Sequence, residues 1–223
     1  MPIEVVKLIE DPRLKLGIVE IAGGKVGEAS ADLRATGVRL AEKVGAEDYE
    51  IPEDKRKAVR QLLKIGGFSP SGRNRPAHEL LVRDIKERGE FNHINNVVDV
   101  NNVTSIENLV PISIFDRDKV GDRLIIRIGE PDEGYVFNQS GHQLDVKRCI
   151  CCCRNDGDAG EPIGTPVKDS METKIFEGAS RYLGVMYFTT DGWSSYEMIG
   201  VNQKFANLLE AETGGYIVTA TVR

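Results

Sequence analysis

The change of residue pattern around Pro111 constrains the fold of this chain more than any other feature. Upstream of it, residues 52–65 and 76–89 each begin with a proline and stop at a glycine, which predicts two helices. Downstream, short β-branched runs are separated by turn signals such as EPDEG, which predicts strands. Helices therefore gather in the first half and strands in the second. This order predicts an α+β fold rather than alternating α/β units.

The expected strands are short runs rich in β-branched or aromatic residues. They are residues 16–21, 124–128, 135–138, 149–153, 182–188 and 216–222. A late helix is expected at residues 203–212, where it would close at a glycine pair. The 223 residues show no internal repeat and no linker, so a single domain covering residues 1–223 is predicted.

The net charge of −6 argues against a general nucleic-acid binder, whose basic face would dominate its field. It still allows a local contact with RNA, because phosphate binding needs only a cluster of Lys and Arg. The N-terminus lacks the pattern of a signal peptide, and no apolar stretch approaches the ~20 residues that span a bilayer. We therefore expect a cytoplasmic protein, with neither DNA nor a membrane as its partner.

All four cysteines lie within residues 149–153, in the order Cys-Ile-Cys-Cys-Cys. If this segment is a strand, Cys149, Cys151 and Cys153 share one face, and Ile150 and Cys152 share the other. Zinc ligands normally come in two separated pairs, and the sequence holds no second pair. We interpret the thiols as small buried hydrophobic groups, and we expect neither a metal nor another cofactor.

Residues 94–110, INNVVDVNNVTSIENLV, form the most informative stretch. The valines alone would suggest a strand, but Asn95, Asp99 and Asn102 fall at i, i+4 and i+7, which is one face of a helix. Asparagine and aspartate have low helix propensity in helix interiors. Amid apolar neighbours they are therefore either exposed or hydrogen-bonded. Two interpretations follow: a structural network that fixes neighbouring loops, which the residue types favour, or the lining of a site.

Three motifs resemble those of a known family. INNVVDVNN, then PISIFDRDKV and an LIIRI strand, are similar to INNVVDVTN, PLHAFDLDKL and a following strand in the B-three/B-four-type editing domain of bacterial phenylalanyl-tRNA synthetase β subunits. Downstream, Lys168-Asp169-Ser170 with Thr173 resembles an Arg-Asp-Ser and Thr segment of free-standing relatives. The resemblance covers residues 68–188 and is weak over residues 1–60. It implies helices in the N-terminal half and a β-sandwich-like mixed sheet core.

The resemblance also implies a function. In that family the domain hydrolyses the ester joining tyrosine to a phenylalanine tRNA, so we expect a trans-editing hydrolase of mischarged aminoacyl-tRNA. The implied pocket lies around the helix at residues 95–102, a turn at residues 111–116 and the segment 168–173. The implied catalytic residues are Asn95, Asp99, Ser113 and Asp169. The implied substrate-binding residues are Asn96, Asn102, Lys168, Ser170 and Thr173.

The expected chemistry is modest, because an aminoacyl ester is already activated. A positioned water and donors for the developing oxyanion are sufficient, without a nucleophilic triad. A buried polar partner such as Asp169, Ser170 or Thr173 would select a hydroxylated cargo. Ser113 stands where the family has a histidine, which favours the alternative of a non-catalytic module that binds tRNA or a free amino acid. No ATP site is evident, so the chain is not expected to be a complete synthetase.

The remaining candidates are basic residues outside these motifs. Arg73 and Arg75 lie in the loop before the second helix and are candidates for contacting the phosphates of a tRNA 3′ end; a solvated helix face is the alternative. His78, His93 and His142 are scattered along the chain. We expect each of them on the surface or in a helix rather than as a catalytic base.

Overall fold

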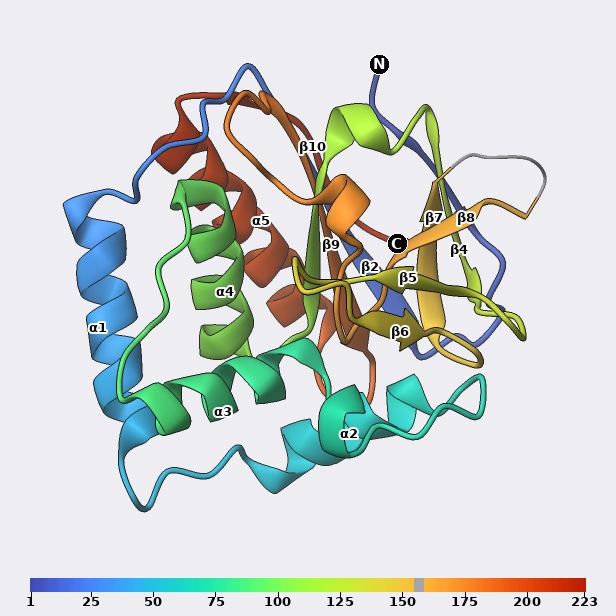
Figure 1. Cartoon of the computed structure of the whole chain (residues 1–223), viewed down its shortest axis with the longest axis horizontal. Helices are drawn as coiled ribbons and strands as arrows, with labels where there is room; N and C mark the ends of the chain where they lie inside the picture. The colour runs from blue at the N-terminus through green and yellow to red at the C-terminus, as the bar shows by residue number, and fades with distance from the viewer. Residues whose placement is uncertain (155–158) are drawn as a thin grey trace.

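The computed structural model describes residues 1–154 and 159–223. Over this part of the chain, two four-stranded sheets pack face to face, and helices cover the outer face of one of them (Figure 1). The first sheet has the strand order β10-β2-β9-β3, and the second has the order β1-β4-β7-β8. A separate hairpin, β5-β6, packs beside β8.

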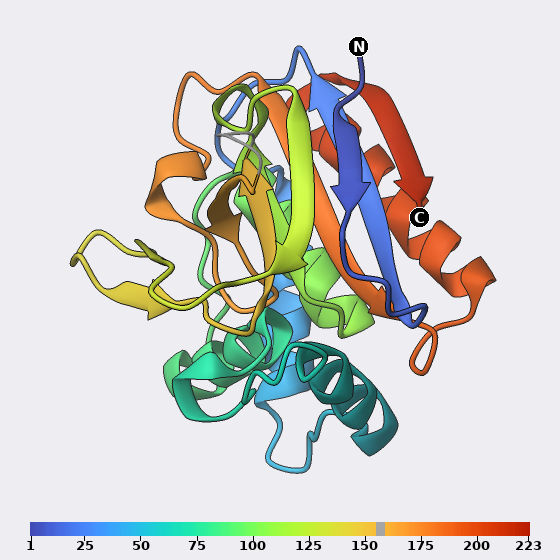
Figure 2. The same cartoon turned by 90° about the vertical axis from the view of Figure 1, so that its right-hand side faces the viewer.

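The strands of the first sheet are β10 (Tyr216–Val222), β2 (Leu14–Ala22), β9 (Arg181–Thr189) and β3 (Ile112–Asp116). Those of the second are β1 (Glu4–Lys7), β4 (Arg123–Ile128), β7 (Ile150–Arg154) and β8 (Glu161–Gly164). The hairpin consists of β5 (Gly134–Val136) and β6 (Gln143–Asp145). In the first sheet all neighbours are antiparallel, whereas β1 runs parallel to β4 in the second. Figure 2 shows β10, β2 and β9 side by side.

The helices are α1 (Ala31–Gly45), α2 (Glu53–Leu63), α3 (Ala77–Arg88), α4 (Asn96–Asn108) and α5 (Ser195–Thr213). Short 3-10 turns are η1 (Gly72–Asn74), η2 (Arg117–Lys119) and η3 (Met171–Thr173). Local signals set several of the ends. Ser194 and Glu197 form a capping box before α5, and Gly89 ends α3 in the left-handed conformation, with φ of 78°.

Successive side chains of a strand point to opposite faces of its sheet, and the apolar ones form two separate cores. In β2, Leu14, Leu16 and Ile18 join the core between the two sheets, while Val19 and Ile21 join the core beneath the helices. The helix α5 lies on β2 and β10, and α4 lies between α5, α3, α1 and β3. The edge strand β3 therefore has the inter-sheet core on one face and α4 on the other.

The α+β class and the elements expected from the sequence are confirmed. Helices occur at α2, α3 and α4, and strands occur at the six expected places, with ends shifted by at most three residues. Two expectations need correction. The last helix begins at Ser195 rather than at residue 203, and residues 112–116 form a strand rather than a turn. The structure also contains four elements that the sequence patterns do not indicate, namely α1, β1, β6 and β8. The helix α5 also lies between the late strands β9 and β10, and two strands precede the helices, so the division between halves is incomplete.

Candidate functional site

Ser113 lies on the edge strand β3 and points into the core between the sheets. Its Oγ is 3.0 Å from the hydroxyl of Tyr187 on β9 and 3.3 Å from the carbonyl oxygen of Thr165. The Tyr187 hydroxyl is in turn 3.0 Å from the Sγ of Cys152 on β7. Burial raises the pKa of both Tyr187 and Cys152, so these groups keep their protons. A chain of neutral hydroxyl and thiol groups thus links the two sheets.

The turn that follows β8 brings a second segment against β3. The sequence Thr-Pro-Val-Lys at residues 165–168 favours a tight turn, because proline presets φ and the threonine hydroxyl accepts backbone donors. The Thr165 Oγ1 accepts from the amides of Val167 and Lys168, at 3.3 and 3.2 Å. The Lys168 carbonyl accepts from the hydroxyl of Tyr135 at 2.6 Å. These bonds fix the backbone that carries the next residue, Asp169.

The carboxylate of Asp169 reaches from this turn to β3. Its Oδ2 accepts a hydrogen bond from the backbone amide of Ile114 at 3.1 Å, whereas its buried Oδ1 has no partner among the described residues. The Oδ1 lies against Gly164, where an added Cβ would stand 2.7 Å from it, so a side chain larger than hydrogen would collide there. Burial raises the pKa of Asp169 to about 7, against the lowering effects of the Ser113 hydroxyl, the Ile114 amide and the charge of Lys174.

Ser170 and Thr173 continue the same segment and are both buried. The Ser170 Oγ accepts from the amide of Glu172 at 3.3 Å and so caps η3, and the Thr173 Oγ1 lies 3.5 Å from the carbonyl oxygen of Ile163. Lys168 is half-buried, with its Nζ 4.0 Å from the centre of the Phe137 ring. Together with Ser113 and Asp169, these side chains form one cluster at the edge of the sandwich.

Asn96 lies at the N-terminus of α4 and binds backbone groups of other segments. The Asn96 Oδ1 accepts from the amide of Gly27 at 2.9 Å. Its Nδ2 donates to the carbonyl oxygens of Lys25 and Glu212, at 3.0 and 2.8 Å. One amide group thereby ties α4 to the loop before α1 and to the end of α5.

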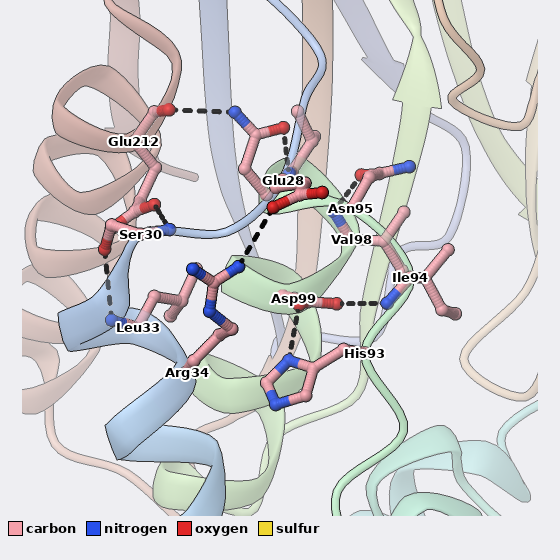
Figure 3. A network of polar contacts seen from close by, with 12 residues as sticks. Glu28, Ser30, Leu33, Arg34, His93, Ile94, Asn95, Val98, Asp99 and Glu212 are labelled. Carbon is pink, nitrogen blue, oxygen red and sulfur yellow. Dashed lines mark hydrogen bonds and ion pairs between the residues drawn. The ribbon is translucent and has the colours of Figure 1, made fainter.

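The neighbouring polar side chains fix the entry of the chain into α4 (Figure 3). The Asn95 Oδ1 caps the helix by accepting from the amide of Val98 at 2.9 Å. The two oxygens of Asp99 accept from the amide of Ile94 and meet the Nδ1 of His93, each at 2.8 Å. These contacts correspond to the structural network that the residue types favoured.

We expect Asn96→Ala to lower the free energy of unfolding by about 2–4 kcal/mol, because it leaves partly buried donors and acceptors of two other segments without their partner. Chemical denaturation of the purified variant measures this loss. Asn102→Ala is the matched control: among the described residues, the side chain of Asn102 forms one hydrogen bond, in which its Oδ1 accepts from the side chain of Asn101 at 3.2 Å. Equal effects of the two substitutions would contradict the role given to Asn96.

The structure brings some of the sequence-predicted residues together and keeps others apart. Ser113, Asp169, Ser170 and Thr173 converge with Lys168, whereas no hydrogen bond or ion pair between described residues joins them to the α4 cluster. Two surface hollows, of about 320 and 380 Å³, are lined by neither group. A cavity shared by the two groups, which the resemblance implies, stays a prediction.

Sequence reasoning missed three members of the edge cluster, namely Tyr187, Thr165 and Gly164. Tyr187 reads as an ordinary apolar strand residue, and only the register of β9 against β3 brings its hydroxyl to Ser113. The Thr-Pro pair was an available turn signal for the segment after β8.

The histidines occupy three different environments. His78 is fully buried in α3, and burial together with the charge of Arg60 lowers its pKa to about 3, so it is neutral. His93 contacts Asp99, and His142 is exposed, with its Nδ1 2.9 Å from the side-chain nitrogen of Asn138.

The cysteine segment follows the predicted alternation. Cys152 and Ile150 join the core between the sheets, and Cys149, Cys151 and Cys153 lie in the other core. All four thiols are free and buried, and burial raises the pKa of Cys149 and of Cys153 to about 12. Within residues 1–154 and 159–223, no three His, Cys, Asp or Glu side chains gather in a way that could hold a metal ion.

Comparison with known proteins adds a family. No curated protein matches the chain. Among solved structures, an N-terminal fragment of the phenylalanyl-tRNA synthetase β-subunit from Pyrococcus horikoshii is similar over 97% of this chain and 50% of that chain, with 15% sequence identity and a TM-score of 0.49. This chain thus spans about half the length of that fragment. Every helix of the described residues is too short or too polar to cross a membrane.

The model of the B3/4 domain family matches residues 70–183, which is slightly more than half of the sequence. This part of the chain carries both polar clusters. The chain belongs to the B3/4 domain family.

Proposed function

We propose that this chain is a trans-editing hydrolase that cleaves the ester of mischarged aminoacyl-tRNA in the cytoplasm, with tyrosine or a similar aromatic or hydroxylated amino acid as cargo. The observation that carries the proposal is the carboxylate of Asp169, which binds the strand that carries Ser113 through Oδ2, while its buried Oδ1 has no hydrogen-bond partner among the described residues. It lies in the stretch that the family model matches, in the motif that resembles synthetase editing domains.

In this proposal, Asp169 acts as the general base. A carboxyl group with a pKa of about 7 is half ionised at neutral pH and still basic enough to accept a proton, which suits such a role. The attacking water gives its proton to Asp169 and its oxygen to the ester carbonyl. The ribose oxygen of the tRNA then leaves and takes up a proton, so that the products are the free amino acid and the intact tRNA.

Access to this carboxylate requires a local movement, because the Oδ1 is covered in the described state and lies against Gly164. The Ser113 hydroxyl is already engaged by Tyr187 and Thr165 and serves to hold the cluster rather than to act as a nucleophile. The α4 residues Asn95 and Asp99 contribute by fixing the helix that supports β3.

We expect Asp169→Asn to slow the hydrolysis of tyrosyl-tRNA charged on phenylalanine tRNA by about 10²–10⁴-fold, because the amide cannot accept the proton of the water. Release of labelled amino acid from a panel of mischarged tRNAs provides the measurement. Asp145→Asn is the matched control, since Asp145 is exposed on β6 and bonds only the amide of Lys147 among the described residues.

A second candidate is a non-catalytic module that binds tRNA or a free amino acid. One observation favours it: neither of the two surface hollows opens onto Asp169. Retention of the ester by the parent protein, together with binding of the aminoacylated tRNA, would establish the module and exclude the hydrolase.

A further inference from the structure

The strand β10 forms one outer edge of the first sheet, whose strand order is β10-β2-β9-β3 (Figure 2). Its seven residues, YIVTATV, include neither a charged residue nor a proline, and all of them are at least partly exposed. The outer side of such a strand presents unpaired backbone groups, which are a template for pairing with another strand.

The other three edges of the two four-stranded sheets are each protected. On β3, the carboxylate of Asp169 accepts from the backbone amide of Ile114. The strand β8 contains Pro162, and the segment at Asp169 also bridges to it. The strand β1 has only four residues, EVVK, with opposite charges at its two ends. Short length, charge, proline and a covering segment are the usual devices that stop edge strands from pairing. Among these four edges, β10 is the long and uncharged one.

The backbone of β10 turns defined groups outward. The amide and the carbonyl of Arg223, directly after β10, both bond to Leu16 of β2, at 2.9 and 2.8 Å. In an antiparallel pair, such residues alternate with residues whose backbone groups point away from the partner strand. Val222 and Ala220 therefore direct their amides and carbonyls to the outer side. A bulge near the start of β10 interrupts this alternation only there.

Two opposite charges flank this edge, one at each end. Glu210, half-buried on the last turn of α5, accepts from the amide of Ile217 at 3.2 Å. That turn holds no basic residue, and a carboxylate at the negative end of a helix is unfavourable without a cation. Neither Glu210 nor the exposed Arg223 forms an ion pair within the described part of the chain. The edge thus carries an unpaired anion near its start and an unpaired cation at its end.

We propose that β10 pairs antiparallel with the β10 of a second copy of this chain, about a two-fold axis at Ala220. The two Ala220 residues then exchange two backbone hydrogen bonds. Counting outward from this pair brings Arg223 of each copy near Ile217 of the other, where the carboxylate of Glu210 lies. A two-fold axis forms this ion pair twice, and it joins the two first sheets into one continuous antiparallel sheet. A parallel pairing would instead bring like charges together.

Sedimentation velocity over a range of about 1 to 500 μM tests this pairing. One strand pair is a small interface, so the expected Kd is about 1–100 μM, for a species of twice the 24.6 kDa of one chain. Ala220→Pro is expected to raise this Kd at least ~30-fold, because the proline ring removes both central hydrogen bonds. In the parent protein, the amides of Ala220 and Val222 are expected to exchange hydrogen more slowly as the concentration rises.

A charge exchange tests the register separately. Glu210→Arg and Arg223→Glu are each expected to raise the Kd about 3- to 30-fold, because each places like charges together. The two substitutions in one chain restore the ion pair with its charges reversed, so the Kd is expected to return to within about 3-fold of the parent value. Lys43→Glu is the matched control, since Lys43 is also an exposed cation and Figure 1 shows α1 away from β10. Its Kd is expected to equal that of the parent.

Several results would overturn the pairing: a parent protein that stays monomeric throughout this range, growth into species larger than a dimer, or a folded Ala220→Pro variant that dimerises like the parent. Circular dichroism establishes whether that variant is folded. The charge variants decide the question independently of the proline, and no recovery in the doubly substituted chain would also overturn the pairing. The result is separate from the proposed hydrolysis, because Asp169 binds β3 at the opposite edge of the sheet.

Discussion

Replacing Glu20 with alanine is expected to lower the free energy of unfolding by about 3–5 kcal/mol, because it leaves a buried cation without its partner. Glu20 is fully buried on β2, where it accepts from the Nε of Arg117 at 3.0 Å and from the Nη2 of Arg181 at 3.1 Å. It also accepts from the backbone amide of Ile3 at 2.9 Å. Arg117 is only 4% exposed, so water cannot replace the lost carboxylate.

Guanidinium denaturation measures this effect. Glu4→Ala is the matched control, since Glu4 pairs with Arg123 at 3.0 Å but both side chains are about half exposed or more. A surface pair of this kind contributes about 1 kcal/mol at most. A loss below about 1 kcal/mol in Glu20→Ala would contradict the stabilising role given to this buried ion pair. The effect is expected to shrink when Arg117 is replaced as well, because the unpaired cation is then absent.

The second large effect concerns the dependence of stability on pH. In the folded protein the pKa of Asp169 is raised to about 7, above the ordinary value of 3.8, so the folded state holds this proton more tightly than the unfolded state. Its stabilising contribution is full below pH 3.8 and is lost as the pH rises through 7. The loss is on the order of 2–4 kcal/mol.

The titration of His78 changes stability with pH in the direction opposite to that of Asp169. Its pKa is lowered from 6.5 to about 3, so the folded state loses stability as the pH falls from 6.5 towards 3. The two slopes oppose each other between about pH 4 and 6.5, and the parent protein is expected to show a flat profile there. Asp169→Asn removes the fall of stability with rising pH that Asp169 causes. Only the effect of His78 then remains, so the stability of this variant is expected to rise steeply with pH over the same range.

Urea denaturation at a series of pH values from 4 to 8 distinguishes these cases. The exposed Asp145→Asn variant is expected to follow the parent profile. A profile of Asp169→Asn that runs parallel to the parent at every pH would show that the carboxyl of Asp169 titrates normally, and it would also remove the support that this pKa gives to a general base.

The sequence predicted local elements well where one signal dominated. The spacing of Asn95, Asp99 and Asn102 indicated the helix α4 against its valines, and the alternation of cysteines indicated the two faces of β7. The helix α1 was missed because Thr36, Gly37 and Val38 are weak helix formers, so packing of its apolar face rather than propensity holds it. Ser194 and Glu197 form a capping box, which is the sequence signal for the earlier start of α5.

The candidate site depends on contacts between distant segments, which a sequence pattern does not contain. The resemblance grouped Ser113 with Asp169, and the structure places both at the edge of β3. The same resemblance grouped the α4 asparagines with them, although Asn96 binds the loop before α1 and the end of α5. The role of Tyr187 depends on the pairing of β9 with β3, a long-range register that no local residue choice reveals. Polar residues within one motif can therefore face different parts of the fold.

The place of β2 between β10 and β9 has a consequence for synthesis on the ribosome. Both neighbours of this strand are made last, since β9 begins at Arg181 and β10 begins at Tyr216. At about 5–20 residues per second, the apolar strand Leu14–Ala22 waits on the order of ten seconds or more with both of its edges unpaired. A nascent chain in this condition is open to aggregation. Its yield in the cell therefore depends on chaperone capacity and on the speed of translation as well as on the final stability of the fold.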